Sequence, residues 1–439
     1  MSAREFFLGK RIAVVGLGPH GEMVADAKYL IKANALVSVY DIRSEARVRS
    51  QIAFLRSIGL ANHFCGAVPS DDLLDMDLIV LSHEYPRDSS FLAEARHKGI
   101  QIEYPETLFL KLAPPVTVVG VMGPCGKATV LSMLDPMLES ACVSNGTQSF
   151  FSADPESGDG VIAHLKKIKS GDILAMRMTE PMMLEISSLG WSPQVAVFTA
   201  VPPAGSYRLS PFEILEHQTY NNYVIGSDQV IDAVRASAGN SKAKMLRTKP
   251  SIVPEDWYFK GRALHDRDNA SLALQAARVF KASDEIARAV LARWKPLKGR
   301  LEPVKKVKSI EFYNDTASMS PEATVSGLAS LSKDRNMVLI AGGADRGADY
   351  RGFYAAVPQY AHTLIMVPGS GTLRERAALR RVDKVEVVSV PSIEEAARSA
   401  LDHAKKGDRV LFSPGFAAAG LDGSRLERGE RFVRAVRAL

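Results

Sequence analysis

The sequence has few cysteines, few aromatic residues and no long apolar run. Its three cysteines, Cys65, Cys125 and Cys142, stand at spacings that form neither a disulfide framework nor a zinc-binding pattern, which is typical of a reducing compartment. No apolar run reaches the roughly 18 residues that a membrane span requires, and the first residues lack the apolar stretch of a signal peptide. The sequence therefore predicts a cytoplasmic protein without membrane insertion.

Runs of like charge are also absent. The 439 residues carry 55 Lys and Arg against 49 Asp and Glu, so the net charge is +6, and 46% of the residues are hydrophobic. This composition is typical of a globular protein and excludes disordered and collagen-like classes. Because the basic residues form no concentrated stripe, we expect an anionic small molecule as the ligand and no nucleic acid.

Three blocks of alternating strand and helix patterns follow one another along the chain. In the first block, short apolar runs at 11–15, 36–40 and 78–81 alternate with helical patterns at 22–31 and 91–97. The second and third blocks repeat this alternation, which is typical of parallel sheets built from strand–helix–strand units. The sequence predicts three consecutive α/β domains, with boundaries at 1–113, 114–297 and 298–439.

A first glycine-rich loop, G-L-G-P-H-G, follows the first expected strand and precedes a helix. Gly16, Gly18 and Gly21 permit a tight turn, and Asp41 ends the next strand. In this context the pattern indicates a nucleotide pocket, with the phosphates at the start of the helix. Three interpretations remain open: NAD binding, binding of another diphosphate nucleotide, or a turn that only packs the helix on the strand.

A second glycine-rich loop, G-V-M-G-P-C-G-K, opens the second block in the position of a P-loop. Gly123 and Gly126 would cradle phosphates, and Lys127 would reach the β- and γ-phosphate oxygens. The residue after the lysine is Ala128, where a Ser or Thr hydroxyl normally binds Mg²⁺, and Thr129 comes one step later. We expect a phosphate cradle with a weakened metal site, or a former P-loop kept only as a turn.

Eight sequence motifs, taken in their order along the chain, resemble those of the Mur ligase family, specifically its MurD type. Together they extend over essentially the whole chain. The motifs are GKRIAVVGLGPHG, YDIRSE, LIVLSHEYPRDSS, HDRDNASLALQAARVF, GRLEPV, FYNDTASMSPEAT, AGGADRGADYRGF and SPGFAAAGLDGSRLERGERF. The resemblance implies a Rossmann-like N-terminal domain that binds a UDP-sugar, a central P-loop ATPase-like domain and a Rossmann-like C-terminal domain that holds an amino acid. It also implies ATP, Mg²⁺ and the addition of D-glutamate to a peptidoglycan precursor.

The resemblance assigns roles to individual residues. The UDP-binding positions it implies are Gly16, Gly18, Gly21, Asp41 and Arg43, and the ATP-binding positions are Gly123, Gly126, Lys127, Thr129, Asp266, Arg300 and Asp315. Lys127 is the expected catalytic cation and Arg346 the expected contact to the amino acid. Metal-ligand candidates are Thr129, Glu180 and Glu185.

At the positions where the resemblance implies contacts to metal ions and to glutamate, this chain has different residues from the family. A metal-binding Glu of the family falls on Glu185 if the letters are matched, but on Arg177 if positions are counted along the expected strand 173–178. The family's Asp-His pair becomes Ala204 and Gly205, and its carbamylated lysine falls at about Gln218, beside His217. Further substitutions stand in the last domain, at Ala317, Met319, Ala418 and Asp422.

These departures favour a Mur-ligase-like protein that binds a nucleotide or a partner protein but has reduced or lost ligase activity. The alternative is an active, divergent MurD-type ligase that adds D-glutamate or another amino acid to a UDP-MurNAc substrate. An NAD-dependent oxidoreductase is disfavoured, because the second and third blocks would have no role in hydride transfer. The sequence predicts neither a partner protein nor an oligomeric state.

Overall fold

The computed structural model describes most of the chain as two compact units. The described residues are 2–18, 21–66, 70–83, 85, 89–146, 148–154, 158, 160–202, 210–237, 241–261, 263, 265–345, 347–380, 382–418 and 425–439. One unit comprises the chain up to Trp257 together with Asp268–Val290, and the other comprises Tyr258–Arg267 and Leu291–Leu439. The first unit holds two β-sheets and the second unit holds one.

Each sheet takes its strands from one continuous stretch of sequence. The first sheet contains β1 (Arg11–Val15), β2 (Leu36–Asp41), β3 (Asn62–Cys65), β4 (Leu78–Leu81) and β5 (Gln101–Glu103). The second contains β6 (Thr117–Met122), β7 (Phe150–Ala153), β8 (Ile173–Arg177), β9 (Val195–Phe198), β10 (Tyr223–Ser227) and β11 (Lys244–Thr248). The third contains β12 (Glu302–Val307), β13 (Ile310–Asn314), β14 (Met337–Ala341), β15 (Ala361–Met366), β16 (Glu386–Ser389) and β17 (Arg409–Phe412).

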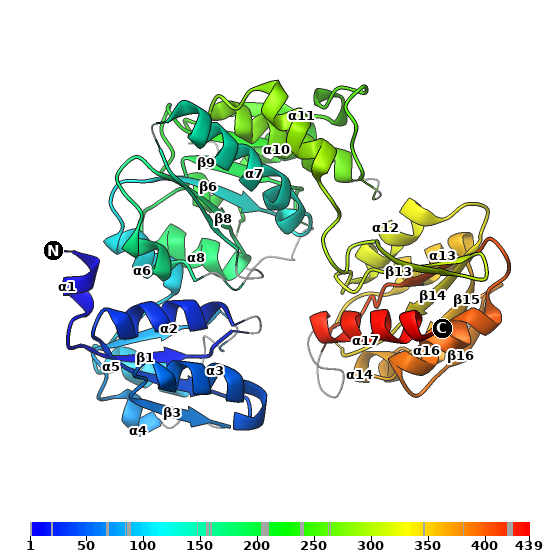
Figure 1. Ribbon diagram of the computed structural model, residues 1–439, viewed down its shortest axis with the longest axis horizontal. Coiled ribbons are helices and arrows are strands. Elements are labelled where there is room, and N and C mark those ends of the chain that lie inside the picture. The colour runs from blue at the N-terminus through cyan, green and yellow to red at the C-terminus, as the bar shows by residue number, and fades with distance from the viewer. Residues whose placement is uncertain are drawn as a thin grey trace. The chain divides into compact units, whose positions relative to one another are not determined.

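Helices connect the strands in each unit (Figure 1). The α-helices of the first unit are α1 (Ala3–Phe7), α2 (Glu22–Lys32), α3 (Glu45–Ser57), α4 (Ser70–Leu73), α5 (Ser90–His97), α6 (Pro105–Leu112), α7 (Lys127–Asn145), α8 (Glu180–Ser188), α9 (Asp228–Ser237), α10 (Asp266–Val279, whose first two residues belong to the second unit) and α11 (Asp284–Arg293, whose last three residues belong to the second unit). Those of the second are α12 (Pro321–Leu331), α13 (Arg351–Tyr360), α14 (Ser370–Arg374), α15 (Arg376–Leu379), α16 (Ile393–His403) and α17 (Arg425–Ala438). Short 3-10 helices are η2 (Ile162–Lys166), η3 (Glu213–Leu215) and η4 (Pro250–Ile252).

The strands of the first sheet are parallel. Helices cover both faces of this sheet, which buries the apolar side chains that its strands carry on either side. The strand order is β3-β2-β1-β4-β5. Alternate residues of β1, such as Ile12 and Val14, pack with α2 and α3, whereas Ala13 and Val15 pack with α5 on the opposite face. Strand order reverses between β1 and β4, and ligands of open α/β sheets bind at such a switch point.

The second sheet is also parallel, in the order β11-β10-β9-β6-β8-β7. Its switch point lies at β6, which pairs with β8 on one side and β9 on the other. The P-loop follows β6 directly and leads into α7, which runs alongside the sheet in Figure 1. The loop is therefore flanked by the carboxyl ends of β8 and β9.

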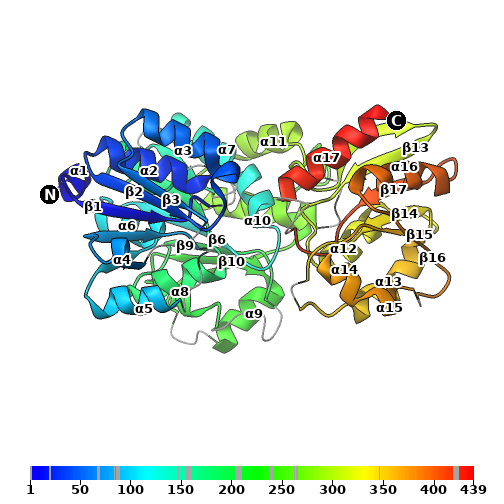
Figure 2. The same ribbon diagram turned by 90° about the horizontal axis from the view of Figure 1, so that it is seen from below.

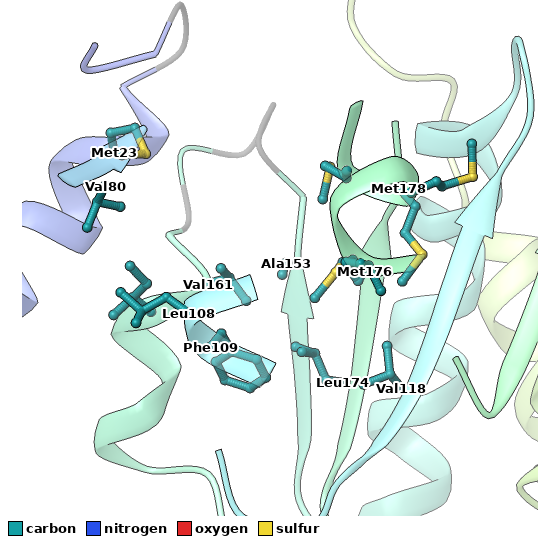
Figure 3. Packing of buried hydrophobic residues seen from close by; sticks show 14 of the residues in the cluster. Met23, Val80, Leu108, Phe109, Val118, Ala153, Val161, Leu174, Met176 and Met178 are labelled. Atoms are coloured by element: carbon teal, nitrogen blue, oxygen red, sulfur yellow. The ribbon is translucent and has the colours of Figure 1, made fainter. Parts of the chain in front are cut away.

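A continuous apolar core joins the first two sheets. Figure 3 shows Met23 of α2 and Val80 of β4 on one side of this core, and Val118 and Leu174 of the second sheet on the other. Phe109 of α6 lies between them and is fully buried. Because burial of apolar side chains is the main stabilising contribution in such a core, the two sheets form one structural unit.

The third sheet has the order β12-β13-β17-β14-β15-β16, with the edge strand β12 antiparallel to β13. Leu328 and Phe353, from α12 and α13, pack on one face. Ala396 and Phe432, from α16 and α17, pack on the other face, and Figure 2 shows these helix pairs on opposite sides of the strands. The third sheet thus also lies between two layers of helices.

These sheets confirm the predicted fold class of consecutive α/β domains with parallel strands. The boundaries at 1–113, 114–297 and 298–439 stay predictions. Among the described residues, none of the helices combines the length and the apolar character that a membrane span requires.

Candidate functional site

The loop after β6 has the backbone of a phosphate cradle. Gly126 has φ +81° and ends the loop at the first turn of α7, in a left-handed conformation that favours glycine. Thr199, which directly follows β9, donates from its hydroxyl to the Met122 carbonyl at 3.1 Å and also to the Cys125 carbonyl. The threonine therefore holds the loop in place from the neighbouring strand.

Lys127 is the first residue of α7 and its side chain turns back over the loop. The ammonium Nζ donates to the Gly123 carbonyl at 2.6 Å, and the residue is half-buried. This position keeps the positive charge beside the loop, where a lysine of a P-loop meets phosphate oxygens. Ala128, the next residue, is buried and offers only a methyl group.

Asn269 of α10 is a second residue at this loop, and it was not among the predicted site residues. A β-carbon on Gly126 would lie 2.7 Å from the Asn269 Oδ1, so only glycine permits this close approach. Asn269 is 4% exposed, and among the described atoms its Nδ2 has no hydrogen-bond partner. A buried amide donor without a partner is costly, and a phosphate oxygen would satisfy it. The asparagine in HDRDNA was the signal that could have found it.

Arg177 stands at the end of β8, beside the P-loop strand. It pairs in register with Val121 of β6, and its Nε lies 2.9 Å from the Asp154 Oδ1. Both side chains are mostly buried, with exposed fractions of 12% and 17%. Glu185 lies in α8, and Glu180 is the first residue of that helix. Arg177 thus ends a strand and Glu185 lies in a helix, while the assignment of Arg177 to the position of the family's Glu stays a prediction.

Among the described residues, the side chains around the P-loop do not fit a Mg²⁺ site. Within the described part of the chain, no group of three or more His, Cys, Asp and Glu side chains could hold a metal ion, so neither Glu180 nor Glu185 belongs to such a group. Thr129 is buried in α7. Arg177, in its ion pair, and Ala128, with its methyl group, stand at the two positions where the resemblance predicts metal ligands, and neither side chain offers the oxygen ligand that Mg²⁺ requires.

The Gln218 side chain holds together the segments that lead into β9, β10 and β11 of the second sheet. The side chain is 3% exposed, and its Nε2 donates to the Pro193 carbonyl at 2.8 Å and to the Tyr223 carbonyl at 3.4 Å. Its Oε1 accepts from the Ser241 hydroxyl at 3.5 Å. The neighbouring His217 is exposed. The amide is therefore committed to holding loop carbonyls.

In the first glycine-rich loop, Asp41 is a buried anchor. Its Oδ2 accepts from the Leu17 backbone N–H at 2.9 Å, and Arg43 binds both carboxylate oxygens, at 2.8 and 2.7 Å. Burial raises the pKa of Asp41, but the hydrogen bonds from Arg43 and Leu17 outweigh it and hold the pKa below its usual range. Asp41 and Arg43 together fix the loop that carries Gly16 and Gly18.

A hollow lies at the switch point of the first sheet, between this sheet and the second. Glu22, Ser82, His83 and Glu106 are among its lining residues. His83 Nε2 lies 2.7 Å from the Glu106 Oε2, and its ring stacks on Tyr104 at 4.7 Å between centroids. The hollow therefore combines the carboxyl groups of Glu22, Asp26 and Glu106 with apolar residues such as Met23 and Val161.

In the second unit, Asp315 follows β13 and is 4% exposed. Its Oδ1 accepts from the Leu301 N–H at 3.1 Å and its Oδ2 from the Ser413 hydroxyl at 2.8 Å. Burial raises the pKa of Asp315 to about 6, although these hydrogen bonds and the charge of Arg300 oppose it. The structure thus places Arg300 close enough to Asp315 for its charge to act on the carboxylate. Both carboxylate oxygens accept hydrogen bonds from within the protein.

The remaining predicted positions are scattered. Asp266, at the start of α10, is buried and its Oδ2 accepts from the Ala263 N–H at 2.9 Å. Four positions named in the sequence analysis lie outside the described residues: Arg346, Ala204, Gly205 and Asp422. Ala317 donates its N–H to the Gly299 carbonyl at 2.9 Å, which closes the turn beside Asp315. The site residues therefore stay predictions, with the geometry given above.

Three α/β sheets, with a glycine-rich loop after the first strand of the first two, are the architecture of the Mur ligases. Residues 299–416 match the family "Mur ligase, glutamate ligase domain". A solved UDP-N-acetylmuramate-alanine ligase, MurC, from Thermotoga maritima superposes with a TM-score of 0.64 at 16% identity, covering 98% of this chain and 99% of that one. The MurF ligase of the same organism, solved with ADP, gives 0.56 at 17%, covering 100% and 96%.

Among individual proteins, the chain is similar to UDP-N-acetylmuramoylalanine–D-glutamate ligases, the MurD type. It is 27% identical to that of Roseiflexus sp. over 98% of both chains. It is 26% identical to that of Caldanaerobacter subterraneus, over 97% of this chain and 98% of the relative. The predicted resemblance to MurD-type Mur ligases is therefore confirmed over nearly the whole chain.

Proposed function

We propose that this protein binds a nucleotide at its P-loop and a UDP-sugar or a related anion at its first glycine-rich loop, without catalysing ligation. The ion pair between Arg177 and Asp154, beside the P-loop, is the observation that carries this proposal. It stands where the resemblance places a metal-binding glutamate.

The chemistry of an ATP-dependent ligase explains why this position matters. A carboxylate attacks the γ-phosphoryl group of ATP to form an acyl phosphate, which an amine then attacks. Bringing two anions together requires Mg²⁺ and lysine to neutralise charge. In this chain Ala128 supplies no metal-binding hydroxyl, Arg177 would repel Mg²⁺, and Gln218 cannot be carbamylated.

Nucleotide binding has separate support. Gly123, Gly126 and Lys127 keep the cradle and its cation, and the buried Asn269 amide is available to an acceptor at the loop. The related MurF ligase was solved with ADP, and the MurD-type relatives are named for a UDP-linked substrate. We therefore infer that ATP or ADP binds at the P-loop largely without metal.

Calorimetry with ATP, in Mg²⁺ and in EDTA, tests the proposal. We expect the two dissociation constants to agree within about twofold, and Lys127→Ala to weaken binding about tenfold, because a hydrogen bond to a charged group contributes about 1.5–3 kcal/mol. Lys333→Ala removes an equal charge from an exposed position and is the control. Binding that becomes more than tenfold tighter with Mg²⁺ would show that the chain retains a metal site.

A further inference from the structure

Glu22 lies at the entrance of the first glycine-rich loop. It is the first residue of α2 and directly follows Gly21. Its side chain folds back over the loop: a β-carbon on Gly18 would lie 2.2 Å from the Glu22 Cδ and 2.3 and 2.4 Å from its two oxygens. Gly18, at φ +75°, therefore leaves the space that the Glu22 carboxylate occupies.

A diphosphate bound to this loop would need the same space. The start of a helix carries unpaired N–H groups and partial positive charge, which attract a phosphate and a carboxylate alike. Glu22 also lines the hollow at the switch point between β1 and β4, together with Ser82 and His83. The carboxylate thus stands where a ligand of this sheet would place its negative charge.

Two further carboxyl groups, those of Asp26 and Glu106, line the same hollow as Glu22. Asp26, one turn further along α2, is 1% exposed and accepts from the Ala163 N–H at 3.1 Å. Burial raises the pKa of Asp26 well above its usual range, and the charges of Glu106 and Glu22 raise it further. Glu106 is itself 5% exposed, and His83 pairs with it. Because the raised pKa favours the neutral form of Asp26, the repulsion of a phosphate in this hollow is assigned to the Glu22 carboxylate itself.

We propose that the Glu22 carboxylate is an internal competitor of the ligand's diphosphate, which must displace it from the loop. The inference deepens the proposed binding of a UDP-type ligand and rests on it. Because the displacement offsets the gain from the phosphates, the wild-type protein binds UDP about as tightly as it binds uridine. Removing the carboxylate opens the loop to phosphate.

The test compares uridine, UDP and inorganic pyrophosphate by calorimetry on the full chain. The variants are Glu22→Ala, Glu22→Gln, which keeps the length but not the charge, and the control Glu45→Gln, which changes an exposed glutamate at the start of α3. We expect both Glu22 variants to bind UDP and pyrophosphate about tenfold more tightly, with less than a twofold change for uridine. The control leaves all three affinities unchanged, and thermal unfolding checks that each variant folds.

The possible outcomes separate the two proposals. UDP and pyrophosphate affinities that stay unchanged in both Glu22 variants would overturn the competitor role, whatever the wild type binds. A gain for pyrophosphate in a protein that binds no uridine would support the competitor role and contradict the UDP-type ligand. A gain in Glu22→Ala but not in Glu22→Gln would mean that bulk, not charge, excludes the phosphates, and would also overturn the inference.

Discussion

Arg177 Nε lies 2.9 Å from the Asp154 Oδ1, at the carboxyl ends of the adjacent strands β8 and β7. The pair is mostly buried and stands one strand away from the P-loop. Two opposite charges held this way offset each other, so the pair adds no net negative charge that would attract a Mg²⁺ ion. The P-loop is therefore bordered by an ion pair on the side where the resemblance predicts a metal ligand.

Breaking this ion pair should destabilise the protein strongly. We expect Arg177→Ala to lower the free energy of unfolding by about 3 kcal/mol, because it leaves a mostly buried carboxylate without its cation. Urea unfolding measures the change. Arg247→Ala is the control, since Arg247 forms exposed ion pairs with Asp228 and Asp232 and should contribute less than about 1 kcal/mol. Equal losses in the two variants would contradict the assigned role of the buried pair.

Replacing Gln218 tests whether this position is structural. Gln218→Ala leaves the Pro193 and Tyr223 carbonyls without their amide donor, so we expect a loss of about 1–3 kcal/mol of stability. Gln359→Ala, which removes an exposed glutamine side chain, should change stability by less than about 0.5 kcal/mol. A Gln218→Ala variant as stable as the wild type in urea would mean that the amide has no structural role.

The buried Asp315 should make stability depend on pH. Its pKa is about 6 in the folded state and near 3.8 when unfolded, so between these values the folded state holds more protons. Stability therefore falls as pH rises from about 4 to about 6, by about 3 kcal/mol for this group, and levels off above. In Asp315→Asn, whose amide can still bond Leu301 and Ser413, this fall should be absent. Urea unfolding at pH 4, 5, 6 and 7 measures the difference, and identical pH profiles for the two proteins would refute it.

Arg428 of α17 should control the order of two loops in the third sheet's unit. Its guanidinium is fully buried and donates to the Ala417 carbonyl at 3.0 Å and the Gly342 carbonyl at 2.6 Å. We expect Arg428→Ala to lower protection from hydrogen exchange at residues 342–345 and 415–418 at least tenfold, because a buried charged donor is lost. Arg434→Ala, on the exposed side of the same helix, is the control. Unchanged protection in Arg428→Ala would contradict this role.

Much of the fold follows from the sequence, because apolar runs of four to six residues alternate with amphipathic helices. The runs at Arg11–Val15 and Leu78–Leu81 are strands with the predicted bounds. The helix after the second glycine-rich loop, α7, extends to Asn145, past Pro136, because its buried residues continue as far as Cys142. Local patterns do not reveal how far such a helix extends.

The sites were less predictable, since their contacts join residues that are distant in sequence or depend on side-chain direction. Arg177 meets Asp154, from a neighbouring strand, and no local pattern specifies that pairing. Asn269 reaches Gly126 across 143 positions of the chain, the difference of the two residue numbers. Glu22 is close to Gly18 in sequence, but only the backbone of the loop determines that its carboxylate folds over the glycine.

The most direct test of the proposed loss of ligase activity is phosphate release. The protein is incubated with ATP, Mg²⁺, UDP-N-acetylmuramoyl-L-alanine and D-glutamate, beside Lys127→Ala and, as a positive control, the Roseiflexus ligase. We predict that the wild type releases no more phosphate than Lys127→Ala, while the Roseiflexus ligase turns over. Phosphate release by the wild type that requires D-glutamate and disappears in Lys127→Ala would contradict the account.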